Sequence, residues 1–158
     1  MAGTHHPVLR PACESDEKFL FTLYAGTRAE EMAASGWNRK TQETFLRQQY
    51  AARRADYTAR FPQAEQSVVT VHGENIGTLL VNRAETEIRL VDFALVPAHR
   101  NQGLGRLLLE SLLAEARAAG KPVKLHVLTH SPARRLYSRL GFILTGNKGE
   151  YVAMTWLG

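Results

Sequence analysis

The residues with the clearest chemical potential form a glycine-containing loop, R-N-Q-G-L-G, which runs from Arg100 to Gly105. An apolar run precedes the loop and ends at Pro97, because proline has no amide hydrogen to give to a neighbouring strand. A run with helical periodicity follows the loop. Amides in the first turn of a helix have no intrahelical acceptor and lie at the positive end of the helix dipole. Glycines at positions 103 and 105 let the backbone approach an anion closely, so the loop predicts a phosphate-binding turn.

Other interpretations of this loop account for fewer of its residues. Two glycines before a helix can simply make a tight turn between a strand and a helix, and this alternative stays open. A dinucleotide-binding fingerprint requires a third glycine where Leu108 stands, and it belongs at the start of a fold rather than far along the chain. A Walker loop requires Gly-Lys-Ser or Gly-Lys-Thr, which the sequence lacks.

A second motif, H-S-P-A-R-R-L-Y-S-R-L-G-F, spans His130 to Phe142. The loop resembles the R/Q-x-x-G-x-G/A signature of the GNAT superfamily of acyl-CoA-dependent N-acyltransferases, and the second motif is similar to that superfamily's A-x-x-L-Y-x-x-x-G-F. The two motifs stand in the order and at the separation that are usual in the superfamily. The order of predicted elements from Val8 to Trp156 also matches, so the resemblance covers nearly the whole chain.

The resemblance implies how acetyl-CoA is held as a cosubstrate. Its pantetheine arm is expected to pair with the strand before the loop, while its pyrophosphate rests on the loop amides. The asparagine that often begins the second motif is absent, since His130 and Ser131 occupy the candidate positions, but Ser131 can still donate a hydrogen bond. The cofactor-binding residues that the resemblance implies are Leu95, Val96, Arg100, Asn101, Gln102, Gly103, Leu104, Gly105, Arg106, Ser131 and Tyr137.

The resemblance also implies two catalytic residues. Tyr137 matches the tyrosine that protonates the departing thiolate in many family members, and a phenol with an ordinary pKa of about 10 can give that proton. The alternative is that Tyr137 only continues the apolar stripe of its helix. Asp92 is the candidate general base, because a carboxylate in an apolar strand must be paired, hydrogen-bonded or open to a cleft. A structural role, with the interior, Arg89 or another basic residue as partner, stays open.

Hydrophobic periodicity and turn residues predict the elements that position these side chains. Strands are predicted at Val8–Arg10, Ser67–His72, Ile76–Asn82, Glu87–Val96, Val123–Leu128, Phe142–Thr145 and Glu150–Trp156. Helices are predicted from Ser15 as N-cap, from Thr41 to Pro62, at Leu104–Ala119 and at Pro132–Leu140, with a less regular stretch at Gly26–Lys40. Strict alternation in the long strand puts Ile88, Leu90, Asp92, Ala94 and Val96 on one face.

The order of these elements predicts an α/β fold, with one domain over residues 1–158 and a mixed, mostly antiparallel sheet that has helices on both faces. A parallel crossover joins Glu87–Val96 to Val123–Leu128. The resemblance to GNAT proteins implies that this central strand pair splays apart, and that the first two helices and their linker form the wall against which the acceptor lies. Residues 1–7 lack a hydrophobic pattern, so we expect a flexible terminus there.

Composition and charge narrow the setting of the protein. The 44% of hydrophobic and 22% of charged residues are typical of a globular domain. The single cysteine, Cys13, excludes an internal disulfide, and nothing at the start resembles an apolar signal segment, so we expect a cytoplasmic protein. No apolar run reaches the roughly 20 residues that span a bilayer, so no membrane partner is expected. The formal charge of +5 is scattered along the chain, which suits a polyphosphate cofactor better than nucleic acid.

Together these features predict an N-acetyltransferase that moves the acetyl group of acetyl-CoA to a primary amine by direct attack in a ternary complex. Cys13 lies outside both motifs, so a covalent cysteine intermediate has no support, and no metal is expected. A small-molecule acceptor is favoured over a protein, and family habit suggests a homodimer. The alternatives are a non-catalytic acyl-CoA-binding regulator with a GNAT fold and, as a third class, a basic nucleic-acid-binding module.

Overall fold

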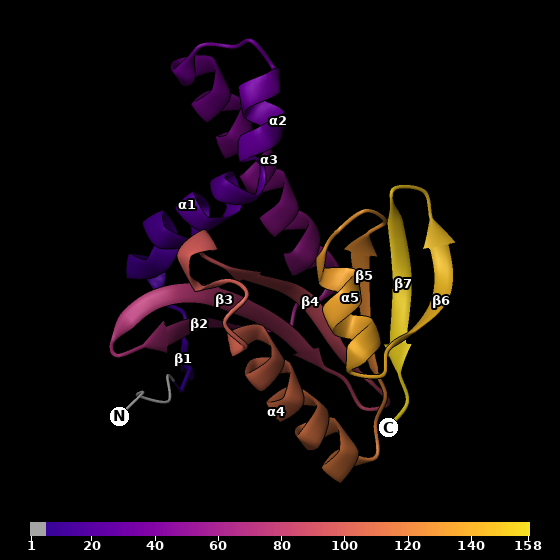
Figure 1. Cartoon of the computed structure of the whole chain (residues 1–158). Helices are drawn as coiled ribbons and strands as arrows, with labels where there is room; N and C mark the ends of the chain where they lie inside the picture. Colours follow the sequence, from indigo (N-terminus) through magenta and orange to yellow (C-terminus); the bar gives the residue numbers. More distant parts are fainter. Residues whose placement is uncertain (1–5) are drawn as a thin grey trace.

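A seven-stranded sheet forms the centre of the structure, a computed structural model that describes residues 6–158 (Figure 1). The strand order is β1-β2-β3-β4-β5-β7-β6. Neighbouring strands are antiparallel except β4 and β5, which are parallel. The predicted mixed, mostly antiparallel sheet is therefore confirmed. Most of the terminus that was predicted to be flexible, residues 1–7, lies outside the described residues.

All seven predicted strands are present in the described part of the chain. They are β1 Val8–Pro11, β2 Glu65–Val71, β3 Glu74–Arg83, β4 Ile88–Leu95, β5 Val123–Leu128, β6 Ile143–Lys148 and β7 Tyr151–Trp156. The largest difference concerns the last hairpin, whose turn was expected at Gly146–Gly149. A bulge at Thr145 lets β6 continue through Gly146, which lies opposite Ala153, so the turn falls at Gly149 and Glu150 instead.

The helices are α1 Glu17–Thr27, α2 Ala29–Ala34, α3 Arg39–Arg60, α4 Leu104–Ala119 and α5 Ala133–Arg139. Ser15 is not the cap of α1, because a 3₁₀ turn precedes the helix and the carboxylate of Asp16 accepts the amide of Cys13 at 2.9 Å. Likewise α3 begins before Thr41, since the side chain of Asn38 accepts the Thr41 amide at 2.8 Å. The stretch expected to be less regular contains the short helix α2.

Helices cover both faces of the sheet, as predicted (Figure 1). On one face, Leu109 and Ala116 of α4 are fully buried in a cluster with Val123 and Leu125 of β5, and α5 joins the same cluster. On the other face, α1, α2 and α3 form a smaller cluster of their own around the buried Tyr50. None of the helices within residues 6–158 is long and apolar enough to cross a membrane.

A β-bulge in β4 changes which side chains face which layer. Consecutive residues of β3 pair with Leu90 and Asp92, so Val91 has no partner and the alternation of side chains shifts by one residue. Leu90 is buried in the cluster under α4, whereas Asp92 and Ala94 line a cavity on the α1 and α3 side. The predicted common face is therefore wrong for the set Ile88, Leu90, Asp92, Ala94 and Val96.

The parallel pair of β4 and β5 opens partway along its length. Pairing runs from Ile88 opposite Val123 to Leu90 opposite Leu125 and ends there, although β4 continues to Leu95. β5 likewise continues to Leu128, where it pairs with β7 on its other side. The expected splay of the central strand pair is confirmed, and its opening begins two residues before Asp92.

Candidate functional site

The loop between β4 and α4 presents a row of free amides. Asn101 and Gly103 have positive φ angles of 60° and 81°, which turn the chain into the helix. Within residues 6–158, no carbonyl or side chain accepts a hydrogen bond from the amides of residues 101–106. The amide of Arg100 is used, since it donates to the Pro97 carbonyl at 3.2 Å. Six consecutive amides at the positive end of a 16-residue helix make a cradle suited to an anion.

The two loop glycines serve different purposes. A Cβ on Gly103 would meet no heavy atom within 4 Å, so this side of the loop is open to a ligand. A Cβ on Gly105 would lie 3.4 Å from both Leu136 and Phe93. The position of Gly105 therefore faces α5 and β4, and its role in the approach of an anion stays a prediction.

Side chains of the loop fasten it to the end of β4. Arg100 donates from Nε to the Leu95 carbonyl at 3.0 Å, and Gln102 donates from Nε2 to the Ala98 carbonyl at 2.8 Å. The guanidinium of Arg106 pairs with Glu110 one turn along α4, at 2.7 Å. The predicted phosphate contact of Arg106 would thus compete with this pair, whereas the loop itself is held in shape without a ligand.

The end of β4 carries the two residues expected beside the pantetheine arm. The Val96 amide donates to the Ile76 carbonyl at 2.8 Å, so it is engaged by β3. The Leu95 carbonyl receives Arg100. Both residues lie beyond the last β4–β5 pair, on the strand that borders the opening. Their contact with a cosubstrate stays a prediction.

Helix α5 brings the second motif to the same region. The Ser131 hydroxyl accepts the Ala133 amide at 3.2 Å, which caps the helix and leaves the hydroxyl hydrogen free to donate. Tyr137 is 6% exposed and its ring lies 5.6 Å from that of Phe142. Burial raises the pKa of Tyr137 above its ordinary value, and the Asp92 carboxylate raises it further. The phenol is therefore protonated at neutral pH, as a proton donor must be.

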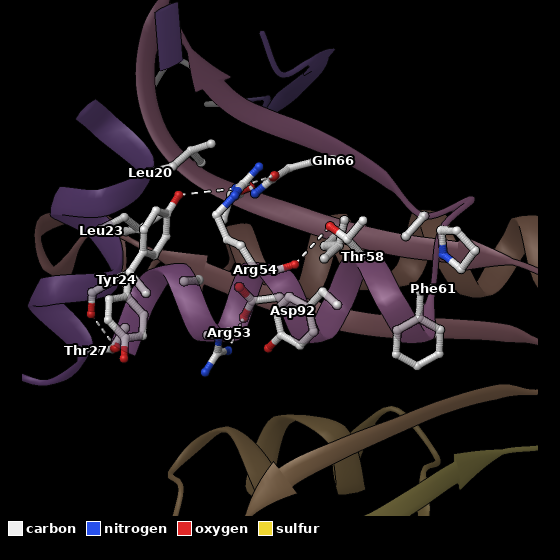
Figure 2. Close-up of a pocket in the computed structure, with 17 residues that line it drawn as sticks. Leu20, Leu23, Tyr24, Thr27, Arg53, Arg54, Thr58, Phe61, Gln66 and Asp92 are labelled. Atoms are coloured by element: carbon white, nitrogen blue, oxygen red, sulfur yellow. Dashed lines mark hydrogen bonds and ion pairs between the residues drawn. The ribbon is translucent and has the colours of Figure 1, made fainter. Parts of the chain in front are cut away.

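A cavity of about 230 Å³ lies on the opposite face of the sheet, between α1, α3 and strands β2 to β4 (Figure 2). Its walls are mostly apolar or aromatic, and a few polar side chains converge on them. The apolar and aromatic lining comprises Leu20, Leu23, Tyr24, Tyr50, Tyr57, Phe61, Leu80 and Ala94. The charged or hydrogen-bonding lining includes Arg53, Arg54, Gln66, Thr78 and Asp92. The predicted wall of two helices is thus α1 and α3.

Asp92 enters this cavity with one oxygen engaged and one available. Its Oδ1 accepts Nη2 of Arg53 at 3.1 Å and the amide of Phe93 at 2.9 Å, whereas Oδ2 has no partner in the described part of the chain. The pairing with a basic residue that the sequence left open is real, but the partner is Arg53. Arg89 instead pairs with Glu87 at 3.6 Å.

Arg53 organises the aromatic side of the cavity. Its guanidinium carbon lies 5.1 Å from the ring centroid of Tyr57 and 5.7 Å from that of Tyr24. Burial, together with the Asp92 carboxylate, raises the pKa of Tyr57, so this phenol too is protonated at neutral pH. No group of three or more His, Cys, Asp or Glu side chains gathers as a metal site within residues 6–158.

A comparison with known protein families identifies the family of this chain. The profile of the Acetyltransferase (GNAT) family matches residues 26–142, which is most of the chain and includes α3, the loop and the second motif. This protein belongs to the GNAT family. As a GNAT acetyltransferase it is expected to bind an acyl-CoA, and the free amides of its loop fit a pyrophosphate.

Solved structures share the GNAT fold of this chain at low sequence identity. The PaiA N-acetyltransferase of Thermoplasma acidophilum, in complex with coenzyme A, has a TM-score of 0.69 at 16% identity, covering 96% of this chain and 99% of its own. An acetyltransferase of Thermus thermophilus has a TM-score of 0.67 at 19% identity, and the match covers 96% of this chain and 98% of that protein. A GNAT family acetyltransferase of Elizabethkingia anophelis with acetyl-CoA bound has a TM-score of 0.61 at 12% identity, and the match covers 97% of this chain and 99% of that protein.

The structure places Asp92 at the cavity and Tyr137 in the core cluster under α4 and α5, and it adds two cavity residues that sequence analysis missed. Arg53 and Arg54 line the cavity although neither belongs to a motif. The sequence does contain a signal for them. Arg53 and Arg54 each lie three or four residues from Tyr50 on one side and from Tyr57 on the other. This spacing puts all four side chains on one face of α3.

Proposed function

We propose that this protein transfers the acetyl group of acetyl-CoA to the primary amine of a small acceptor. The observation that carries the proposal is the opening of the β4–β5 pair after Leu90. β4 alone then supplies Asp92 on the cavity side and, a few residues later, the loop with its free amides. An acceptor in the cavity and a cosubstrate on the loop would therefore meet along one strand.

The cosubstrate is proposed to bind from the loop toward the opening. The amides of residues 101–106 would hold the pyrophosphate, since they have no acceptor within residues 6–158 and Gly103 leaves space beside them. The pantetheine arm would follow β4 at Leu95 and Val96, with the hydroxyl hydrogen of Ser131 as a further donor. Support comes from the coenzyme A and acetyl-CoA that are named with two structures of the same fold.

The residues at the opening suit direct transfer. The acceptor ammonium would lose a proton to Oδ2 of Asp92, which no protein group occupies in the described chain, and the neutral amine would attack the thioester carbonyl. A bond forms between nitrogen and carbon while the carbon–sulfur bond breaks. Tyr137 would give its proton to the departing thiolate, and the phenolate would take back the second proton that the nitrogen loses as the amide forms. Burial raises the pKa of Tyr137, so the phenol is protonated again before the next turnover. The products are the N-acetylated amine and free coenzyme A.

Calorimetric titration with acetyl-CoA, followed by a thiol-release assay over a panel of small amines, tests this proposal. We expect binding and amine-dependent release of thiol. Binding without release of thiol with any amine would favour the non-catalytic regulator. That alternative is supported by the absence of the usual asparagine, since His130 and Ser131 occupy its candidate positions. Absence of binding would mean that the loop is only a turn. Cytoplasmic location and a homodimer stay predictions from the sequence.

A further inference from the structure

The two cavity arginines differ in what they pair with. Arg53 is neutralised by the carboxylate of Asp92. Arg54 donates from Nη1 to the Tyr50 hydroxyl at 3.2 Å and to Oε1 of Gln66 at 3.1 Å, and both of these partners are uncharged. Its Nε and Nη2 have no acceptor within the described residues. Arg54 therefore contributes to the cavity lining a positive charge that forms no ion pair with a carboxylate in the described part of the chain.

Arg54 is held by an ordered chain of hydrogen bonds. The Thr78 hydroxyl gives its hydrogen to the Ser67 carbonyl at 2.8 Å, so it can only accept from Nε2 of Gln66, at 3.3 Å. The amide of Gln66 consequently turns its oxygen toward Arg54. Thr78 is 4% exposed, which makes the base of this chain rigid. Figure 2 shows the guanidinium of Arg54 bonded to Gln66, and its Nε and Nη2 have no acceptor among the described residues.

The charge around Arg54 favours an anion. Helix α3 carries six basic residues and two acidic ones, which leaves a formal charge of +4. Two of the basic side chains are offset by those two acids, since Arg47 pairs with Glu43 and Arg60 with Asp56. Neither of those pairs lines the cavity. Of the other four basic residues, Arg39 and Lys40 lie outside the cavity and Arg53 pairs with Asp92, so Arg54 is the lining arginine whose charge can attract an acidic ligand.

The size and lining of the cavity limit the rest of the ligand. Its volume of about 230 Å³ is below the roughly 300–1,000 Å³ of sites for drug-sized ligands. Leu20, Leu23 and Phe61 present apolar surface beside the polar groups. A compact molecule with an apolar body, an amine and one anionic group matches the apolar side chains, the carboxylate of Asp92 and the guanidinium of Arg54, respectively.

We infer that the acceptor is a free amino acid with an apolar side chain, and this inference rests on the proposed acetyl transfer. Arg54 binds the acceptor carboxylate through Nε and Nη2, because a guanidinium offers two parallel donors that match the two carboxylate oxygens. The amine then lies toward Oδ2 of Asp92, and the side chain packs against the apolar wall. Arg54 is a specificity residue in this arrangement and takes no part in the chemical step.

The test compares amino acids with their amides, which keep the size and the amine but lack the negative charge. Thiol release from acetyl-CoA is measured with L-leucine, L-methionine and L-phenylalanine and with the amide of each. We expect the acids to have KM values at least about tenfold lower. Arg54→Leu should raise KM for the acids roughly 10- to 100-fold and change kcat little, since a hydrogen-bonded charge pair is lost. The amides and the Kd of acetyl-CoA should be unaffected.

Arg60→Leu is the matched control. It removes the same charge from the same helix, but Arg60 pairs with Asp56 outside the cavity. We expect KM for the acids to stay within about twofold in this variant, because screening weakens a distant exposed charge. An equal rise in both variants would assign the effect to the general charge of α3. Arg54→Lys keeps the charge without the fork, and an intermediate KM is expected.

The outcomes separate this inference from the proposed transfer. If acids and amides react equally well, or if Arg54→Leu slows both alike, the acceptor is not bound by its carboxylate, although the transferase stands. If acetyl-CoA binds and no amine releases thiol, the proposed transferase fails. Calorimetry with L-leucine on the coenzyme A-loaded protein then tests whether the cavity binds an amino acid. Binding that Arg54→Leu abolishes would support the carboxylate site. Absent binding, or equal binding in the variant, would overturn it.

Discussion

The loop and the cavity on the two sides of the β4–β5 opening are built in opposite ways. The loop is made from the backbone of a few consecutive residues, and its donors are amides that any sequence supplies once the chain adopts the right angles. The cavity is made from side chains of α1, α3 and three strands, which meet only in the folded chain. We therefore expect the loop to recognise a group common to a whole family, and the cavity to determine which acceptor this member uses.

The strongest test of that division is Gly103→Glu. The new carboxylate would lie where the pyrophosphate is expected, and like charges in contact cost several kcal/mol, so acetyl-CoA affinity should fall at least about 100-fold. Gly120→Glu is the control, because Gly120 also has a positive φ, of 66°, with no atom near its Cβ, at the other end of α4. Calorimetry on both folded variants would contradict the site if they bound acetyl-CoA equally.

Tyr137→Phe should separate chemistry from binding. The ring and its packing on Phe142 are kept, so the melting temperature and the Kd of acetyl-CoA should hardly change. Loss of a general acid should lower kcat roughly 100-fold or more. Steady-state thiol release measures this loss. A variant with full kcat would show that Tyr137 belongs to the buried core alone, and that water protonates the thiolate.

Asp92→Asn should act on the cavity side without disturbing the loop. The amide oxygen of asparagine can still accept from Arg53 and from the Phe93 amide, so the local structure is kept while the basic Oδ2 is lost. We expect kcat/KM for the acceptor to fall roughly 10- to 100-fold, with acetyl-CoA affinity unchanged. Unchanged kcat/KM at saturating acetyl-CoA would reduce Asp92 to a structural partner of Arg53.

Asp16→Asn should weaken the wall of the cavity rather than either binding surface. The Asp16 carboxylate takes two hydrogen bonds from Arg10, at 2.7 and 2.9 Å, and caps the turn before α1 through Cys13. We expect the free energy of unfolding at pH 7 to fall by about 1–3 kcal/mol. Denaturant unfolding measures this, and acetyl-CoA affinity should be retained under native conditions.

The same variant has a predicted pH dependence. Arg10, followed by the Cys13 amide, holds the pKa of Asp16 well below its ordinary value in the folded chain. The stabilisation is therefore complete above the unfolded pKa of about 3.9 and is lost as the pH falls toward the folded pKa. The difference in unfolding free energy between the wild type and Asp16→Asn should thus be constant near neutrality and shrink below about pH 4. A difference that stayed constant to pH 2 would contradict this assignment.

Local sequence sufficed where a single element carries its own boundary signals. The limits of α4 and β5 agree with those predicted, because Gly120 adopts the left-handed conformation that ends α4 and Pro122 stands before β5. The position of the loop after Pro97 was likewise predictable. The start of α1 was not, because Ser15 and Asp16 are both good capping residues, and the Asp16 carboxylate is taken by Arg10 and the Cys13 amide instead of a cap bond to α1.

The sequence by itself determined the order of the predicted strands and longer helices, the position of the glycine-containing loop and the place of Tyr137 on its helix, since periodicity and turn residues act over a few positions. Tertiary structure alone decided the face of Asp92, because the bulge at Val91 depends on the register with β3. It also decided the partners of the two cavity arginines. Arg53 bonds Asp92, which lies 39 residues away in the chain, and Arg54 bonds Gln66, which lies 12 residues away. Whether an arginine is neutralised or left free for a ligand depends on which distant side chains the fold brings to it.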